Sequence, residues 1–128
     1  MKKLPKPTVA ELQILQILWS QGPSSVREVN DILNKKRDVG YTTTLKIMQI
    51  MAEKGLAVRD TSTRTHIYKA TVSEGDTQKQ LLNRFLETTF KGSASKLVMQ
   101  ALGNHEASAE ELEKIKALIK KIEDEQSK

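Results

Sequence analysis

One stretch of the sequence carries polar side chains at a spacing that suits hydrogen bonding from a single helix face. At 100° per residue, one side of the segment 42–53 collects five polar residues and an isoleucine, of which all but Glu53 are candidates for DNA contact: Thr42, Thr43, Lys46, Gln49, Glu53 and Ile50. Lysine can donate to guanine O6 and N7, glutamine can bind adenine through two hydrogen bonds, and threonine can contact a phosphate or a thymine methyl group. This face is therefore suited to reading base edges; the alternative is an ordinary solvated helix face.

Residues beside this face could add contacts. Arg64 follows the expected tip of a hairpin, where its guanidinium suits a phosphate or the minor groove, and a solvated hairpin is the alternative. The Tyr41 hydroxyl could bond a backbone phosphate, and a packing role is equally open. Ile50 could touch a thymine methyl group or pack against the hairpin. Tyr41 and Arg64 complete the candidate DNA-contacting set.

The sequence shows no pattern typical of an enzyme or a metalloprotein. It contains no cysteine, which excludes disulfides and thiolate metal sites, and its two histidines, His66 and His105, are too few for a histidine-built zinc centre. There is no Gly-rich phosphate loop, and Ser24 and Ser25 are interpreted as helix caps rather than nucleophiles. We therefore predict no catalytic residue, no cofactor and no metal.

The positive charge of the chain is concentrated in its first half. Residues 1–71 hold 12 Lys and Arg against 6 Asp and Glu, a balance of +6, whereas residues 72–128 hold 9 against 10, a balance of −1. The sum is the overall charge of +5. Phosphate contacts supply most non-specific affinity for nucleic acids, so a basic half-chain around the polar helix face favours a polyanionic partner.

The elements that would position this face follow from local signals. Thr8 with Glu11 and Ser25 with Glu28 are capping boxes, which predict helices from Thr8 to about Ser20 and from Ser25 to about Lys35. A third helix begins near Thr42 and ends at Gly55, which suits a left-handed C-cap. The inner face of the third helix is expected to join Trp19 in the core: Thr44, Leu45, Met48, Met51 and Ala52.

A β-hairpin should follow the third helix. Residues 56–60 and 64–71 are rich in β-branched and aromatic side chains and flank a polar tip at 61–63. We therefore expect a mainly α fold: a winged helix-turn-helix domain over residues 1–72, with three helices and a two-stranded wing, followed by a helical dimerisation domain over residues 73–128.

The second half of the chain has apolar stripes and little chain to bury them. Residues 77–124 read as three helices, of which the last begins with a third capping box at Ser108 and Glu111. These stripes could fold back on the first domain, but pairing with a second copy is favoured, because large exposed apolar patches are rare on monomers. The residues expected at the dimer interface are Leu81, Leu82, Phe85, Leu97, Leu112, Ile115 and Ile119.

The sequence favours a cytoplasmic protein without membrane insertion. No apolar run approaches the roughly 20 residues that span a bilayer. The N-terminal segment, MKKLPKPT, has lysines but no apolar region behind them, so it does not resemble a signal peptide.

Several motifs together resemble the BlaI/MecI penicillinase-repressor family. They are YTTTLKIMQIMAEKGL at 41–56, R-x-H-x-Y-x-A at 64–70, E-L-x-I-L-x-I-L-W at 11–19 and G-S-x-x-x-L-V at 92–98. The resemblance implies a homodimeric winged-helix transcriptional repressor that binds palindromic operator DNA through its N-terminal domain and dimerises through its C-terminal helices. Many relatives have arginine where this chain has Ile50, which implies a different operator.

The resemblance also implies a mode of induction. In the best-known members a membrane sensor signals a β-lactam, and a protease that depends on the sensor cleaves the repressor in its C-terminal domain. That point corresponds to Gln100 and Ala101 here, where those members carry an Asn-Phe pair. Related copper-responsive repressors have a C-terminal cysteine cluster, which this cysteine-free chain lacks.

Two other functions compete with a DNA-binding repressor. A winged-helix protein-interaction module would use the basic face to dock an acidic partner, but such modules usually lack a polar, base-capable outer face on the third helix. A regulator that responds to a small molecule would hold its ligand between the domains, where the short C-terminal arm leaves little room.

Overall fold

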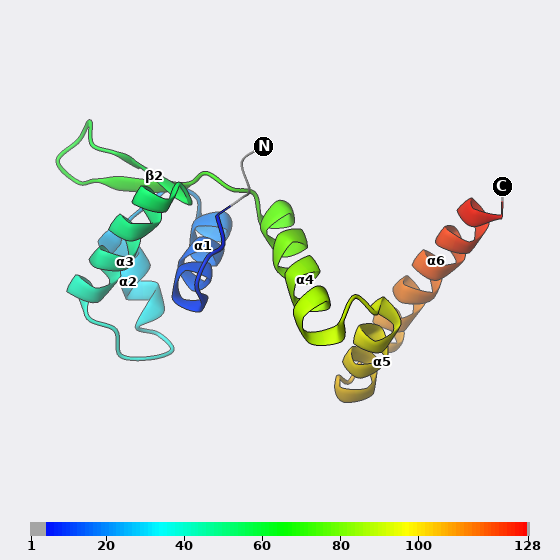
Figure 1. The fold of residues 1–128 in the computed structure, drawn as a ribbon. Helices are drawn as coiled ribbons and strands as arrows, with labels where there is room; N and C mark the ends of the chain where they lie inside the picture. The colour runs from blue at the N-terminus through cyan, green and yellow to red at the C-terminus, as the bar shows by residue number, and fades with distance from the viewer. Residues whose placement is uncertain (1–4, 128) are drawn as a thin grey trace. The chain divides into compact units, whose positions relative to one another are not determined.

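The computed structural model describes residues 5–127, and Figure 1 shows their helices and strands. Residues 1–4, which belong to the N-terminal segment compared with a signal peptide, lie outside this range. In chain order the elements are α1 (Val9–Gln21), β1 (Ser24–Ser25), α2 (Val26–Leu33), α3 (Tyr41–Lys54), β2 (Ala57–Asp60), β3 (Ile67–Ala70), α4 (Glu74–Phe90), α5 (Ala94–Asn104) and α6 (Ala109–Gln126).

The chain divides into two compact units, one ending at Asn83 and one beginning at Arg84. This division lies within α4, whereas the sequence pattern places the domain boundary after residue 72. The boundary at 72 stays a prediction. None of the described helices is long and apolar enough to cross a membrane.

Local capping signals set the ends of the first three helices. The Thr8 hydroxyl accepts the Glu11 N–H at 3.1 Å while the Glu11 carboxylate accepts the Thr8 N–H at 2.8 Å. Ser25 and Glu28 form the same pair of bonds at 3.1 and 2.9 Å, so both predicted capping boxes are confirmed. Gly55 ends α3 in the left-handed conformation, with φ of 83°, as its residue type predicts.

The wing belongs to a sheet with one more strand than the sequence predicts. β2 and β3 form the expected antiparallel hairpin, with Ala57 opposite Ala70 and Asp60 opposite Ile67. β1 pairs with the other edge of β3, so the strand order is β1-β3-β2. Ser25 therefore serves both as the cap of α2 and as a strand residue, and a two-residue strand carries no periodic signal in the sequence.

The second wing strand is shorter than expected. We predict a strand from residue 64, but β3 begins at Ile67, which leaves His66 in the loop rather than on a strand. Short polar contacts hold this loop: Asp60 Oδ1 accepts the Ser62 N–H at 2.9 Å, and the Thr63 hydroxyl donates to the Thr65 carbonyl at 2.7 Å. These local bonds compete with strand pairing and widen the loop.

The core of the first unit lies among α1, α2, α3 and the sheet. It contains the inner faces of the three helices together with residues that follow α3 and lie in β3: Ile14, Leu15, Ile17, Leu18, Val26, Val29, Met48, Met51, Leu56, Ala57 and Tyr68. Trp19 is half-buried at the edge of this core rather than within it. Its indole N–H donates to the Val72 carbonyl at 2.9 Å, which explains why the ring stays at the edge.

The second unit exposes most of its apolar side chains. Neither α5 nor α6 contains a buried residue among those described. Within α4, the rings of Phe85 and Phe90 meet edge to face, with centroids 5.5 Å apart. Only half of the predicted third capping box forms: Ser108 accepts the Glu111 N–H at 3.0 Å, while the Glu111 carboxylate lies 3.5 Å from His105 Nε2.

Candidate nucleic-acid interface

The two faces of α3 separate as the helical spacing predicts. Thr44, Met48 and Met51 are fully buried, and Leu45 and Ala52 are partly buried against the core. The structure places the five DNA-contact candidates of the outer face on the exposed side of the same helix, and Glu53 is exposed there too: Thr42, Thr43, Lys46, Gln49 and Ile50. Their geometry suits hydrogen bonding to base edges from one rigid element, and their role as DNA contacts stays a prediction.

A buried amide fixes the beginning of α3. Asn30 of α2 donates from Nδ2 to the Thr44 hydroxyl at 2.8 Å and to the Val39 carbonyl at 3.0 Å. Asn34 Nδ2 also donates to the Val39 carbonyl, at 2.9 Å, and its Oδ1 accepts the Val39 N–H at 2.9 Å. These bonds close the turn between the two helices of the helix-turn-helix.

Asn30 and Asn34 are not among the residues that the sequence singles out. One signal could have found Asn30: it follows Val26 by four residues, so it lies on the apolar, buried face of α2. A polar residue on such a face needs a partner, because a buried amide without hydrogen bonds is costly. Its partner, Thr44, was expected in the core only for its place on the inner face of α3.

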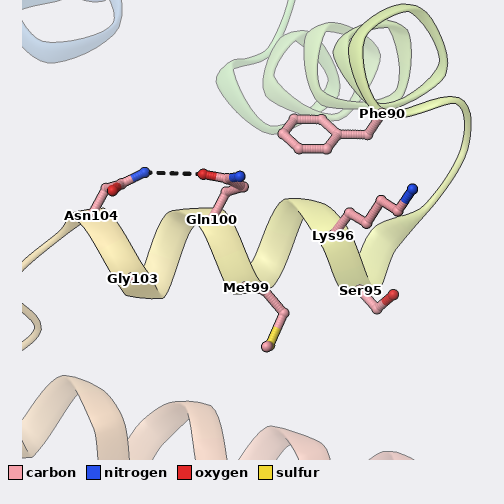
Figure 2. A pocket seen from close by; sticks show the side chains of 7 residues that line it. All are labelled: Phe90, Ser95, Lys96, Met99, Gln100, Gly103 and Asn104. Atoms are coloured by element: carbon pink, nitrogen blue, oxygen red, sulfur yellow. Dashed lines mark hydrogen bonds between the residues drawn. The ribbon is translucent and has the colours of Figure 1, made fainter.

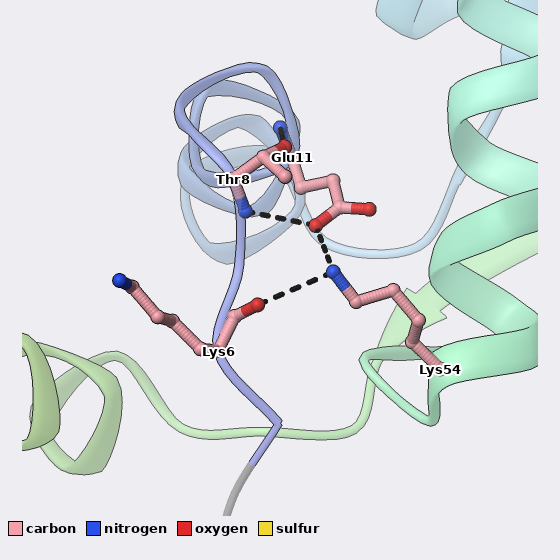
Figure 3. Close-up of polar contacts among 4 residues, drawn as sticks. All are labelled: Lys6, Thr8, Glu11 and Lys54. Carbon is pink, nitrogen blue, oxygen red and sulfur yellow. Dashed lines mark hydrogen bonds and ion pairs between the residues drawn. The ribbon is translucent and has the colours of Figure 1, made fainter.

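An ion pair fixes the other end of α3. Lys54 Nζ lies 2.6 Å from Glu11 Oε1 and 3.2 Å from the Lys6 carbonyl oxygen, as Figure 3 shows. Burial raises the pKa of the Glu11 carboxyl, but the hydrogen bonds from Lys54 and Thr8, together with the Lys54 charge, outweigh it and hold this pKa below its usual value. The last turn of α3 is thereby tied to the first turn of α1.

A hollow of about 540 Å³ lies beside α3. It is lined by residues of α2, α3, β2, β3 and the wing loop, among them Tyr41 and Gln49 of the candidate set. Three arginines line it as well: the predicted Arg64, together with Arg27 and Arg59, which the candidate set lacks. Arg27 Cζ lies 5.3 Å from the centroid of the Tyr41 ring. Tyr41 is 43% exposed, so its ring both packs against Arg27 and faces solvent.

The candidate dimerisation residues lie on α4, α5 and α6. Leu82, Phe85, Leu112 and Ile119 are exposed, and the other three are half-buried: Leu81, Leu97 and Ile115. Further apolar residues that the candidate set omits are exposed on α5 and α6: Val98, Met99, Leu102, Leu118 and Ile122.

The residues at the predicted cleavage point are exposed in the middle of α5. Gln100 accepts a hydrogen bond from Asn104 Nδ2 at 3.2 Å, and both line a hollow of about 550 Å³. Figure 2 shows Phe90 of α4 on the side of α5 that bears Gln100, whereas Met99 points away from it. Ala101 follows Gln100 in the same helical turn.

No group of three or more His, Asp or Glu side chains able to hold a metal ion occurs within residues 5–127. The side-chain hydrogen bonds described above join helices and turns of the winged unit. In the same part of the chain, every buried side-chain nitrogen and oxygen has a hydrogen-bond partner. Hydrogen bonds and an ion pair therefore hold α3 at both ends. The helix exposes a polar face, and a basic hollow lies beside that face.

The chain is similar to known proteins over most of its length. A family model described as penicillinase repressor matches residues 7–121. The penicillinase repressor of Bacillus licheniformis is 24% identical over 119 residues, which cover 93% of this chain and 93% of that protein.

Two solved structures are similar to more than half of the chain. One is the solution structure of the DNA-binding domain of the repressor BlaI, with a TM-score of 0.52. The other is the Bacillus licheniformis BlaI monomeric form in complex with the blaP half-operator, with a TM-score of 0.51. Each is 25% identical and covers 59% of this chain and 93% of its own.

Proposed function

This chain belongs to the penicillinase repressor family, and on that premise we propose that it is a transcriptional repressor that binds a palindromic operator as a homodimer. The observation that carries the proposal is the exposed polar face of α3, held at one end by Asn30 and at the other by Lys54. A helix fixed at both ends can present Lys46 and Gln49 to base edges in a constant orientation. Such a repressor acts in the cytoplasm, where it meets DNA.

The half-operator complex of the related BlaI supports one winged unit per half-site. That protein binds a half-operator in its monomeric form. By analogy, one copy of this chain would occupy one half-site through α3 and the wing, and two copies would occupy an inverted repeat. Helix-turn-helix dimers bind half-sites about one helical turn of DNA, or a multiple of it, apart.

The apolar side chains of the second unit support the homodimer. Phe85, Leu112 and Ile119 are between 38% and 50% exposed, and they lie on helical stripes where a second copy could cover them. Covering these side chains removes apolar surface from water, which favours association at about 25 cal/mol per Å² before the entropy cost of association.

Induction by cleavage belongs to the same proposal. A protease acting between Gln100 and Ala101, under the control of a membrane sensor, would separate α5 into two parts and detach α6 from the winged unit. Because both residues lie within α5, the helix must unwind locally before the bond can enter a protease site. Mass spectrometry of the repressor from cells exposed to a β-lactam tests this step: a fragment ending at Gln100 is expected, and an intact chain during derepression would contradict it.

Selection of bound duplexes from a random pool tests the central proposal. We expect the recovered sequences to share an inverted repeat, and gel shift at several salt concentrations to retain a preference for that repeat as salt rises. Binding that lacks sequence preference at every salt concentration would favour the protein-interaction alternative. A single unrepeated motif would contradict the dimeric mode.

A further inference from the structure

Three arginine side chains from three different elements converge on the hollow between α3 and the wing. Arg27 comes from α2, Arg59 from β2 and Arg64 from the loop that follows β2. We propose that this hollow binds the phosphodiester backbone of the operator, and that Arg27 and Arg59 are phosphate-contacting residues of the interface. The inference rests on the proposed function and extends it to residues outside the recognition helix.

The positive charge of the hollow is not neutralised from within the chain. No Asp or Glu lines it, and none of the three arginines has a carboxylate within 4.0 Å in the described residues. All three side chains are exposed. Like charges gathered on one hollow repel one another, so an anion that enters it relieves this repulsion.

Two carboxylates that are adjacent to these arginines in sequence have other partners. Glu28, next to Arg27, accepts the Ser25 N–H, and this bond holds the pKa of its carboxyl below the usual value. Asp60, next to Arg59, accepts the Ser62 N–H, with the same effect on its pKa. Both carboxylates therefore stay charged and bonded to the backbone, where they stabilise the α2 cap and the wing turn.

Tyr41 orients Arg27. The guanidinium carbon Cζ lies over the Tyr41 ring, 5.3 Å from its centroid, which is within the range of a cation–π contact. A guanidinium held beside a ring keeps N–H groups for an acceptor, and guanidinium edges pair with phosphate through two parallel bonds. Since Tyr41 is the first residue of α3, a phosphate held by Arg27 would also set the position of the recognition helix.

The position of the hollow favours the DNA backbone over a free phosphate. Gln49 belongs both to the hollow and to the outer face of α3, so the two surfaces are continuous. A duplex that places base edges against Lys46 and Gln49 must carry its backbone along the margin of this face. The hollow is built by the same elements that form that margin, and it contains the phosphate-binding groups.

The salt dependence of operator binding tests the proposal. Each phosphate contact contributes about 0.9 to the slope of log K against log salt concentration. We expect Arg27→Ala and Arg59→Ala each to flatten the slope by about 0.9 per half-site, which is about 1.8 for a dimer on its operator, and the double variant by about 3.6, without a change in base preference. Arg27→Lys and Arg59→Lys should restore most of the slope, because they keep the charge.

Lys120→Ala is the matched control, because it removes one positive charge from an exposed position on α6. Its slope should equal that of the unchanged protein. Unchanged slopes for both arginine variants, with thermal unfolding intact, would overturn the proposal while leaving the repressor function in place. If the unchanged protein shows no sequence preference at any salt concentration, the proposed function itself fails, and this inference fails with it.

Two further measurements test whether Tyr41 orients Arg27 and whether the bound phosphate belongs to the DNA backbone or is a free anion. Tyr41→Leu should remove most of the effect of Arg27→Ala, whereas Tyr41→Phe should retain it, because the ring rather than the hydroxyl orients the guanidinium. Equal effects of Arg27→Ala in all three backgrounds would contradict this orienting role. Tight binding of inorganic phosphate to the DNA-free protein in titration calorimetry, lost in the double variant, would overturn the assignment to the DNA backbone.

Discussion

Asn30 donates its side-chain amide to the Thr44 hydroxyl at 2.8 Å, and both residues are buried between α2 and α3. This bond joins the two helices of the helix-turn-helix at the point where the recognition helix begins. Its direction sets the rotation of α3, because Thr44 lies on the face opposite Lys46 and Gln49. This buried bond therefore helps to set which side chains of α3 are exposed.

We expect Asn30→Ala to lower the free energy of unfolding by about 1–3 kcal/mol, because it leaves the buried Thr44 hydroxyl without its donor. Operator affinity should also fall, although Asn30 is buried and lies away from the exposed face of α3. Urea unfolding and gel shift measure the two effects. The double variant with Thr44→Val should be no less stable than Asn30→Ala alone, since both changes remove the same bond. If the stability losses of the two single variants add in the double variant, the two side chains do not stabilise the protein through their mutual hydrogen bond.

Lys46→Ala should weaken operator binding by about 1–3 kcal/mol per base contact and relax the base preference at one position of each half-site. The reason is the central place of Lys46 on the exposed face of α3. Binding to a panel of operators with single base changes checks it. A uniform loss on every sequence would identify Lys46 as a phosphate contact instead.

Arg64→Ala should reduce affinity for all DNA sequences by a similar factor and flatten the salt slope by about one for each half-site that the protein occupies. Arg64 is exposed in the wing loop and lines the basic hollow. Titrations of specific and scrambled duplexes at several salt concentrations measure both quantities. If binding at low salt is unaffected, the wing does not contact DNA.

Replacing Phe85 and Ile115 by Asp should convert the dimer into a monomer, because each change places a charge on an apolar stripe that a partner would bury. Sedimentation equilibrium at micromolar concentration measures the mass. The matched control is Val9→Asp, which changes a 77% exposed residue at the beginning of α1 and should leave the dimer intact. A monomeric unchanged protein would contradict the dimeric repressor altogether.

Glu11→Gln should lower the free energy of unfolding by about 1–3 kcal/mol at neutral pH, because Lys54 loses a buried, charged partner. The pKa of Glu11 in the folded protein lies below its usual value of 4.5, so the unfolded chain binds the proton more tightly. The stabilisation is therefore fully present above about pH 4.5 and disappears as pH falls through the lower, folded pKa.

Urea unfolding of the unchanged protein and of the Glu11→Gln variant between about pH 3 and 7 follows this linkage. The stability difference between the two should be constant at higher pH and shrink below about pH 4.5. A difference that persists unchanged into the acid range would show that the charge of Glu11 contributes nothing, and that the loss comes from packing alone.

The sequence alone determines the features that depend on contacts within a turn or two of chain. The capping boxes at Thr8 and Ser25 and the left-handed glycine at Gly55 each involve neighbours no more than a few residues away. The two faces of α3 follow from helical periodicity. Local sequence could therefore predict the winged helix-turn-helix and the exposed residues of its third helix.

Tertiary structure decided the contacts between segments far apart in the chain. Glu11 meets Lys54 across 43 residues, and Trp19 meets the Val72 carbonyl across 53. β1 exists only because β3 passes beside Ser24 and Ser25, whose sequence carries a cap signal and no strand pattern. The residues next to each partner in sequence give no sign of the distant contact, so no local sequence pattern predicts that contact.

The basic hollow shows the same limit at the candidate site. Arg27 follows a helix cap, Arg59 lies on a strand and Arg64 lies in a loop, so in sequence each is an isolated surface cation. They gather in one place because α2, α3 and the hairpin pack around a shared core, which fixes the side of each element that faces the hollow. Side-chain chemistry is set by residue type, but its convergence depends on packing, and only the folded chain determines that.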